Sequence, residues 1–197
     1  MNLDVGEPNV YGAVYLNSTF NWLAINNTNQ IVIVSLHLGT EAYQRFKLPT
    51  GFDEVPQTEP TLCVLGGFLC FLHCFKKADL LIWKMNIFGV QDSWTLFLKI
   101  TIADLVPNYD FNCKDLQLVP LLLSDDSETL ILCRHYENGD NEDEGILYNC
   151  RHDAAQRTQI TPSRNHSDPT GGVNFSDQVI WCLAKAYVES LVSFGSE

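Results

Sequence analysis

Basic residues are scarce in this sequence, and so is methionine. The chain has 12 Lys and Arg residues against 24 Asp and Glu, so its formal net charge at pH 7 is −12. A surface this acidic repels the phosphates of nucleic acids and the headgroups of anionic lipids. We therefore exclude nucleic acid and a membrane surface as expected partners. With only 2 Met, the apolar residues are mainly branched and aromatic, as in β-rich cores.

Long apolar runs and the short motifs of common enzymes are also absent. No apolar run reaches the length of about 18 residues that a membrane span needs. The first ten residues, MNLDVGEPNV, lack the basic start and apolar stretch of a signal peptide, so we expect a cytoplasmic or nuclear protein. The sequence contains no GxxxxGK[ST], GxGxxG, GxSxG or HExxH. It therefore predicts neither an enzyme nor a cofactor site.

The 7 cysteines give no disulfide or zinc pattern. Cys70, His73 and Cys74 lie together in FLCFLHCF, but a zinc site needs a second ligand pair at matching spacing, and none exists. In a strand, Cys70 and Cys74 would share one face while His73 points to the other. Because the expected compartment is reducing, we predict free thiols that pack as small apolar side chains.

Short strand-like segments recur along the chain in groups of four. The first group covers residues 14–16, 20–24, 31–36 and 43–48, with polar turns at Asn17-Ser18-Thr19 and at residues 26–30, where Asn26 is expected to cap the backbone. The second covers 62–65, 68–72, 80–85 and 94–100, with a turn at Gly66-Gly67. The third covers 118–123, 129–133, 146–148 and 157–160. A period of about 50 to 60 residues that holds several strands is typical of propeller blades.

This pattern predicts an all-β fold of antiparallel, four-stranded, blade-like repeats. We expect one domain over residues 1–197, a partial, kelch-like β-propeller of about three blades. Residues 178–192 fit a strand and a helix equally well. We expect the cores of the blades to bury Trp22, Ile33, Leu65, Phe71, Ile82, Trp94, Leu121 and Ile131.

Acidic residues concentrate in two connecting segments. The loop that ends at residue 144 carries most of them, and the connector after the first group carries more; the candidate partner-binding residues are Glu137, Asp140, Glu142, Asp143, Glu144, Asp53 and Glu54. Such a run is typical of a solvated loop, which is the interpretation we favour. The alternative is a recognition surface that steers a basic partner. The loop lacks the DxDxDG spacing of a calcium site.

Several sequence blocks together resemble a known family. The blocks VYLNSTFNWLA, DSW and YVESLVS are similar to those of the F-box-associated domain of plant F-box proteins, of the S-locus F-box and F-box/kelch-repeat type. The resemblance covers residues 12–193. It implies a β-propeller-like, non-catalytic module that binds the target protein of an SCF-type ubiquitin ligase. Catalytic residues, metal and cofactor are then not expected, because other subunits transfer ubiquitin.

The chain departs from that family in one respect. The F-box, which binds the Skp adaptor and through it the cullin, has no counterpart in this sequence. We therefore expect adaptor and cullin to be reached only through an F-box absent from this chain. Two alternatives stay open: a truncated family fragment without ligase function, and a propeller-type hydrolase with inward-facing carboxylates about 5 to 10 Å apart.

We predict that the purified protein contains seven titratable thiols and no stoichiometric metal. A thiol reagent added to the denatured, unreduced protein should react with all 7 cysteines, and elemental analysis should find no zinc. One zinc per chain that disappears in the Cys70→Ala variant would contradict this prediction.

Overall fold

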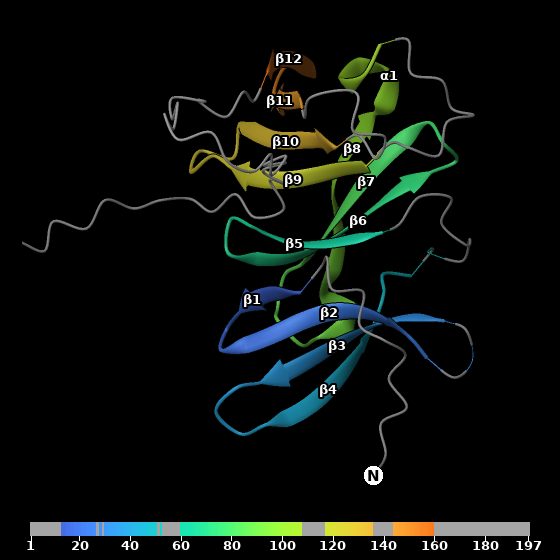
Figure 1. The fold of residues 1–197 in the computed structure, drawn as a ribbon, viewed down its shortest axis with the longest axis vertical. Helices are drawn as coiled ribbons and strands as arrows, with labels where there is room; N and C mark the ends of the chain where they lie inside the picture. The colour runs from blue at the N-terminus through green and yellow to red at the C-terminus, as the bar shows by residue number, and fades with distance from the viewer. Residues whose placement is uncertain are drawn as a thin grey trace, which may run out of the picture.

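Three antiparallel sheets make up the described part of the chain. The computed structural model describes residues 13–26, 28, 30–50, 52, 60–107, 117–135 and 144–159. Within these residues, twelve strands form three four-stranded sheets (Figure 1), which confirms the all-β prediction. The expected segment over residues 178–192 lies outside the described residues. No helix in the described part is long and apolar enough to span a membrane.

The first sheet is a meander of strands β1 to β4. Its strands are β1 (Val14–Leu16), β2 (Thr19–Ile25), β3 (Ile31–His37) and β4 (Ala42–Lys47), paired in chain order. Asn17 and Ser18 turn the chain between β1 and β2 with φ of 49° and 59°, as short hairpin turns require. Between β2 and β3, the Asn26 Oδ1 accepts bonds of 2.9 Å from the backbone N–H groups of Thr28 and Gln30. The expected turn chemistry at these two points is confirmed.

The second and third sheets repeat this meander. The second holds β5 (Thr61–Leu65), β6 (Phe68–Phe75), β7 (Asp79–Met85) and β8 (Trp94–Thr101), with a 3₁₀ helix at Gln91–Ser93 and the short helix α1 (Ile102–Leu105). The third holds β9 (Gln117–Leu123), β10 (Thr129–His135), β11 (Glu144–Asn149) and β12 (Ala154–Gln159). Strand β12 begins three residues before the expected start at Arg157.

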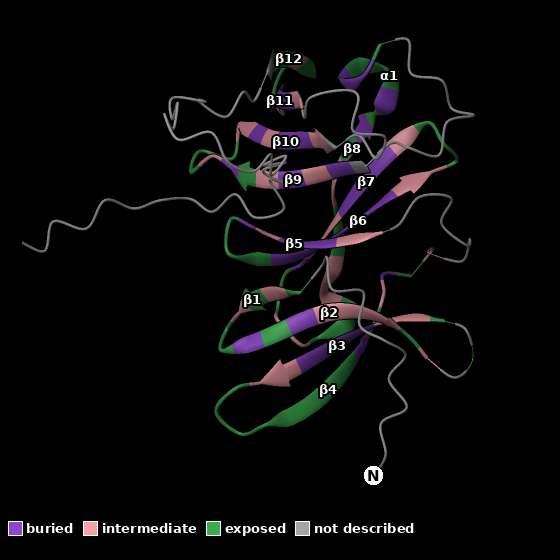
Figure 2. Cartoon of the chain, viewed as in Figure 1, coloured by how far each residue is buried: buried purple, intermediate pink, exposed green. Residues whose placement is uncertain are grey.

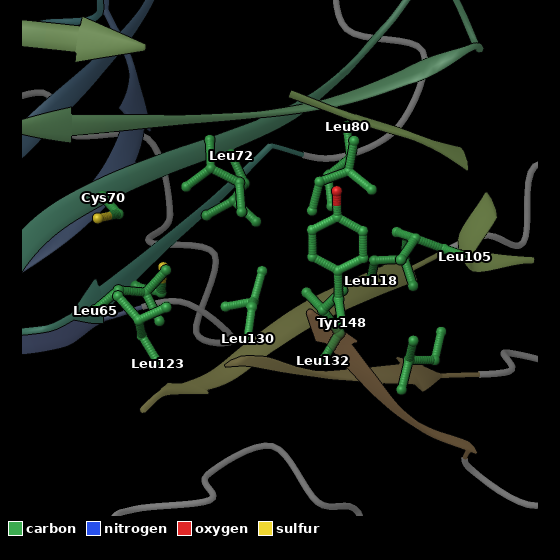
Figure 3. Packing of buried hydrophobic residues seen from close by; sticks show 14 of the residues in the cluster. Leu65, Cys70, Leu72, Leu80, Leu105, Leu118, Leu123, Leu130, Leu132 and Tyr148 are labelled. Carbon is green, nitrogen blue, oxygen red and sulfur yellow. The ribbon is translucent and has the colours of Figure 1, made fainter. Parts of the chain in front are cut away.

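The second sheet lies between the other two, and both faces of its strands β5 to β7 are largely buried. Leu69 and Phe71 of β6 belong to a cluster with Ile33 and Phe46 of the first sheet. The alternate residues of β6, Cys70 and Leu72, belong to a second cluster shared with the third sheet. Figure 3 shows Leu72 and Leu80 facing Leu130 and Tyr148 across this contact. Strands β6 and β7 are accordingly mostly buried, whereas β4 is mostly exposed (Figure 2).

The three sheets meet along one side. The first strands of the sheets adjoin, since β5 contacts β1 and β2 on one side and β9 on the other. Near the last strands of the sheets, connecting segments fill the space between neighbouring sheets instead. Phe88 packs edge-on against Phe46 at 5.9 Å between ring centroids, and the Trp94 Nε1 donates to the Lys47 carbonyl at 3.2 Å. The Ile102 and Leu105 side chains of α1 fill the corresponding place beside the third sheet.

Four of the eight expected core residues are buried and four are not. The prediction is confirmed for Ile33, Leu65, Phe71 and Ile82. It is wrong for Trp22, Trp94, Leu121 and Ile131, which are only half-buried. Trp22 and Ile131 point away from the second sheet. Trp94 begins the edge strand β8. Leu121 is the unpaired residue of a β-bulge opposite Ile131 and Leu132. Alternation alone does not say which face of a strand has a neighbour.

We predict that the Phe71→Ala variant lowers the free energy of unfolding by about 3–5 kcal/mol, since a fully buried ring is replaced by a cavity between two sheets. The control is Leu96→Ala, which truncates an exposed side chain of β8 in the same sheet and should change stability by about 0.5 kcal/mol or less. Urea unfolding measures both. Equal losses for the two variants would contradict the burial of β6 against the first sheet.

Candidate functional site

The acidic loop connects β10 and β11, which form a hairpin. Its residues Glu137, Asp140, Glu142 and Asp143 lie outside the described residues, and so do Asp53 and Glu54 of the other acidic connector. The structure therefore does not place these six carboxylates relative to one another. Of the seven candidate residues, it describes Glu144.

Glu144 is the first residue of β11 rather than part of the loop. It lies opposite Arg134 of β10 and Gln159 of β12 in the strand register. Its Oε2 lies 3.7 Å from the Arg134 Nη1, and its Oε1 lies 3.8 Å from the Arg157 Nε. The Arg134 and Glu144 side chains are largely screened from water, whereas Arg157 is exposed. The Glu144 charge is thus balanced by two guanidinium groups within the sheet, so it differs in kind from the acids that precede it.

These ion pairs fix the base of the hairpin. Arg157 also donates from Nε to the Leu105 carbonyl of α1 at 3.2 Å, which ties the third sheet to the segment that follows the second. The loop therefore leaves β10 and re-enters β11 beside these two ion pairs, which Arg157 links to α1. Arg134 and Arg157 are the residues that sequence reasoning missed. Their positions in the sequence would have indicated an ion pair with Glu144 only if the strand register had been known.

Other acids of the third sheet lie at the opposite end of β10 and have partners. The Ser124 hydroxyl and the Glu128 backbone N–H donate to Asp126, and these bonds lower the pKa of that carboxyl. Glu128 pairs with Arg151. These groups stabilise the turns that join β9 to β10 and β11 to β12, so their role is structural.

Three side chains that could act as nucleophiles, Tyr148, Cys63 and Cys150, are held protonated. Burial raises the pKa of the Tyr148 hydroxyl well above its usual value, and Asp153, to which that hydroxyl donates, raises it further. Burial likewise raises the pKa of the Cys63 and Cys150 thiols. A nucleophile needs the opposite shift. Tyr148 and these two cysteines therefore serve packing.

The Cys70, His73 and Cys74 cluster divides between the two faces of β6, as predicted. Cys70 and Cys74 lie in the cluster shared with the third sheet. His73 lies on the other face, where its ring packs against Phe71 and Phe52 and its Nε2 accepts a 3.3 Å bond from the Trp83 Nε1. Among the described residues, no group of three His, Cys, Asp or Glu side chains is placed to hold a metal.

One further surface stands out, the face of the first sheet turned away from the second. We call it the aromatic face; its residues are Tyr15, Phe20, Trp22, Val34, Leu36, Tyr43, Arg45 and Lys47. Tyr15, Phe20, Leu36 and Tyr43 are successive cross-strand partners, so they form one row across all four strands. Tyr15 packs edge-on against Phe20, and Trp22 against Tyr43. The sequence showed the alternation of these side chains, but not that no other described sheet covers this face.

The chain was also compared with known proteins. No protein-family model, no curated protein and no solved structure matches it.

We predict that Glu144→Gln lowers the free energy of unfolding by about 1 kcal/mol, because it leaves the half-buried guanidinium group of Arg134 and the exposed one of Arg157 without their carboxylate. The matched control is Glu142→Gln, an identical change two residues earlier in the acidic run, which should cost about 0.5 kcal/mol or less. Chemical denaturation compares them. An equal effect of both variants would show that Glu144 is an ordinary loop acid.

Proposed function

We propose that this protein is a non-catalytic protein-binding module that recognises a target for ubiquitination. Its loop of residues 136–143 would contact a basic segment of the target. The observation that carries the proposal is the base of that loop, where Arg134, Glu144 and Arg157 hold the two strand ends together. A recognition loop on a rigid support loses less conformational entropy on binding than a free one.

The charge distribution supports a basic partner. Glu144 is balanced by arginines, but the four acids that precede it, Glu137, Asp140, Glu142 and Asp143, stand beside no basic residue in the loop sequence. The whole chain carries a net charge of −12. Such a surface attracts cationic segments over a distance of about a Debye length, so it accelerates their association.

The arrangement of the sheets supports the finer part of the proposal, a propeller-like scaffold. Each sheet is a four-stranded meander in chain order, and the first strands β1, β5 and β9 adjoin. Propeller blades are placed in this way around their axis. With the resemblance to the F-box-associated domain, this favours the target-binding part of an F-box protein. Ubiquitin transfer would then be done by other subunits, reached through an F-box.

The test is reversal of the four loop acids in one variant, Glu137→Lys, Asp140→Lys, Glu142→Lys and Asp143→Lys. A random 15-residue peptide library is selected against the wild-type chain. We expect Lys- and Arg-rich peptides whose association rate falls as salt rises. Their affinity for the variant should be lower by about 100-fold, the effect of losing several attractive charges and gaining repulsive ones.

The matched control reverses four exposed acids elsewhere, Glu41, Asp92, Asp104 and Asp125. It makes the same change in net charge, so it separates a local loop effect from the general field of the protein. Peptides that bind both variants equally well would show that the loop does not take part in recognition. A second arm fuses an F-box upstream of the chain. The fusion, but not the chain alone, should bind the Skp adaptor in a calorimetric titration, and it should direct ubiquitination of a protein that carries the selected peptide.

A further inference from the structure

The aromatic face of the first sheet is an exposed apolar surface that the packing of the sheets leaves unused. Tyr15 is 55% exposed, Tyr43 50% and Phe20 41%. No other sheet in the described part of the chain covers them, because the second sheet packs on the opposite face, against Ile33 and Phe46. Exposed apolar side chains gathered on one face are typical of a binding surface.

The same face carries two positive charges and no negative one. Arg45 and Lys47 follow Tyr43 at alternate positions of β4, and both are exposed. Neither forms an ion pair with another described residue. In a chain with 24 acidic and 12 basic residues, a basic patch without an acid beside it is uncommon. Charge complementarity therefore favours a partner that is acidic where it meets β4.

The face also holds a hydrogen-bond donor that the described structure does not use. Trp22 and Tyr43 meet edge-on across β3, with their ring centroids 6.4 Å apart. The Trp22 Nε1 is buried there, and among the described residues no group accepts its hydrogen bond. An unpaired buried donor costs free energy. A partner that brings an acceptor onto this face supplies the missing bond once the indole ring turns.

The arrangement of the rings disfavours a flat ligand. The planes of Tyr15 and Phe20 meet at 64°, and those of Trp22 and Tyr43 at 90°. Nucleic-acid bases stack on rings that present their flat sides, and two rings at right angles cannot both do so toward one base. The net charge of −12 opposes a phosphate backbone as well. An uneven aromatic surface instead fits the projecting apolar side chains of a protein.

The dimensions of the face fit a helix better than an extended chain. Four strands spaced by about 4.8 Å make a surface about 14 Å wide, of which one extended segment covers about one strand spacing. A helix with its side chains is about 10 Å wide. Arg45 and Lys47 are about 6.8 Å apart along β4, close to the separation of about 6 Å between residues i and i+4 of a helix.

From this we infer that the aromatic face binds an acidic amphipathic helix of a partner protein. The helix lies along β2 and β3 with its apolar stripe on Phe20, Trp22 and Leu36. Two carboxylates four residues apart on its flank pair with Arg45 and Lys47. Helix-on-surface recognition of this kind uses apolar anchors at i, i+4 and i+7. The inference does not rest on the proposed function, since it uses another surface and a partner of the opposite charge.

The experiment begins with a selection against the full chain. The probe is a displayed library of helical peptides with Leu fixed at i, i+4, i+7 and i+11, and with Gln, Glu or Lys in equal proportion at the flanking positions. It is sorted in parallel against the wild type and against the variant Phe20→Ser with Tyr43→Ser. Peptides that bind the wild type but not the variant should carry Glu at two flanking positions four residues apart. Peptides that bind the acidic loop are retained by both, so the two proposals fail independently.

Fluorescence anisotropy then measures the affinity of a selected peptide. Arg45→Glu with Lys47→Glu should weaken binding by about 100-fold, because two attractive pairs become repulsive. Replacing the two Glu residues of the peptide by Gln should weaken it by about 10-fold and remove its salt dependence. The matched control, Lys76→Glu with Lys77→Glu, makes the same change in net charge at the exposed turn between β6 and β7 and should change affinity by about 2-fold or less.

Circular dichroism and urea unfolding establish that the variants fold, and Tyr43→Ser alone replaces the double variant if that one does not. Several results would overturn the inference. They are an equal pool of peptides from the wild type and the variant, a selected pool rich in Lys or without charge preference, and equal effects of the two charge reversals. The absence of any face-dependent peptide would do the same, as when a second copy or the chain's own residues occupy the face. So would a single-stranded oligonucleotide that displaces the peptide.

Discussion

The burial of the second sheet on both faces is the constraint on which the rest of the structure depends. In β6, FLCFLHCF, the alternate side chains Leu69 and Phe71 pack toward the first sheet, and Cys70 and Leu72 toward the third. A strand with two apolar faces has no solvent-compatible side, so it requires a neighbour on each. One four-stranded sheet has too little surface to supply this by itself, which is why the repeats are stable only together.

Several features follow from this stacking. Because the first strands β1, β5 and β9 adjoin, the chain must fill the space near the last strands with other groups. It does so with Phe88 on one side and α1 on the other. The turns and loops are left at the ends of the sheets. The acidic loop is one of them, and the ion pairs of Glu144 hold its base against the same scaffold.

The sequence predicted the strands and most of their turns because both depend on neighbouring residues. Alternation and branched side chains indicated twelve strands close to those observed, and Asn17, Asn26 and Gly66 marked turns by their backbone preferences. It could not predict which strand faces would be covered, since that depends on contacts between distant segments. Trp22 and Ile131 were expected in the core for this reason, and Phe71 was placed correctly.

The same limit applies to the candidate site. Glu144 ends a run of acids, so the sequence assigned it to the loop. Its partners Arg134 and Arg157 are distant in the chain and come into reach only through the register of β10, β11 and β12. The aromatic face was missed because a lone row of aromatic residues has the same alternation as a buried one. In both cases the missing information is the pairing of segments, not the nature of any residue.

The most direct test of this account measures contacts across the two sheet interfaces. In a methyl-labelled sample, nuclear Overhauser effects should connect Ile33 of the first sheet with Leu69 of the second, and Leu72 and Ile82 of the second with Leu130 and Leu132 of the third. Each of these side chains is buried in one of the two clusters, and methyl groups in one packed cluster lie within about 5 Å of their neighbours. We expect both sets of cross-peaks in the same folded species. A spectrum in which each sheet shows only its own internal contacts would contradict the account.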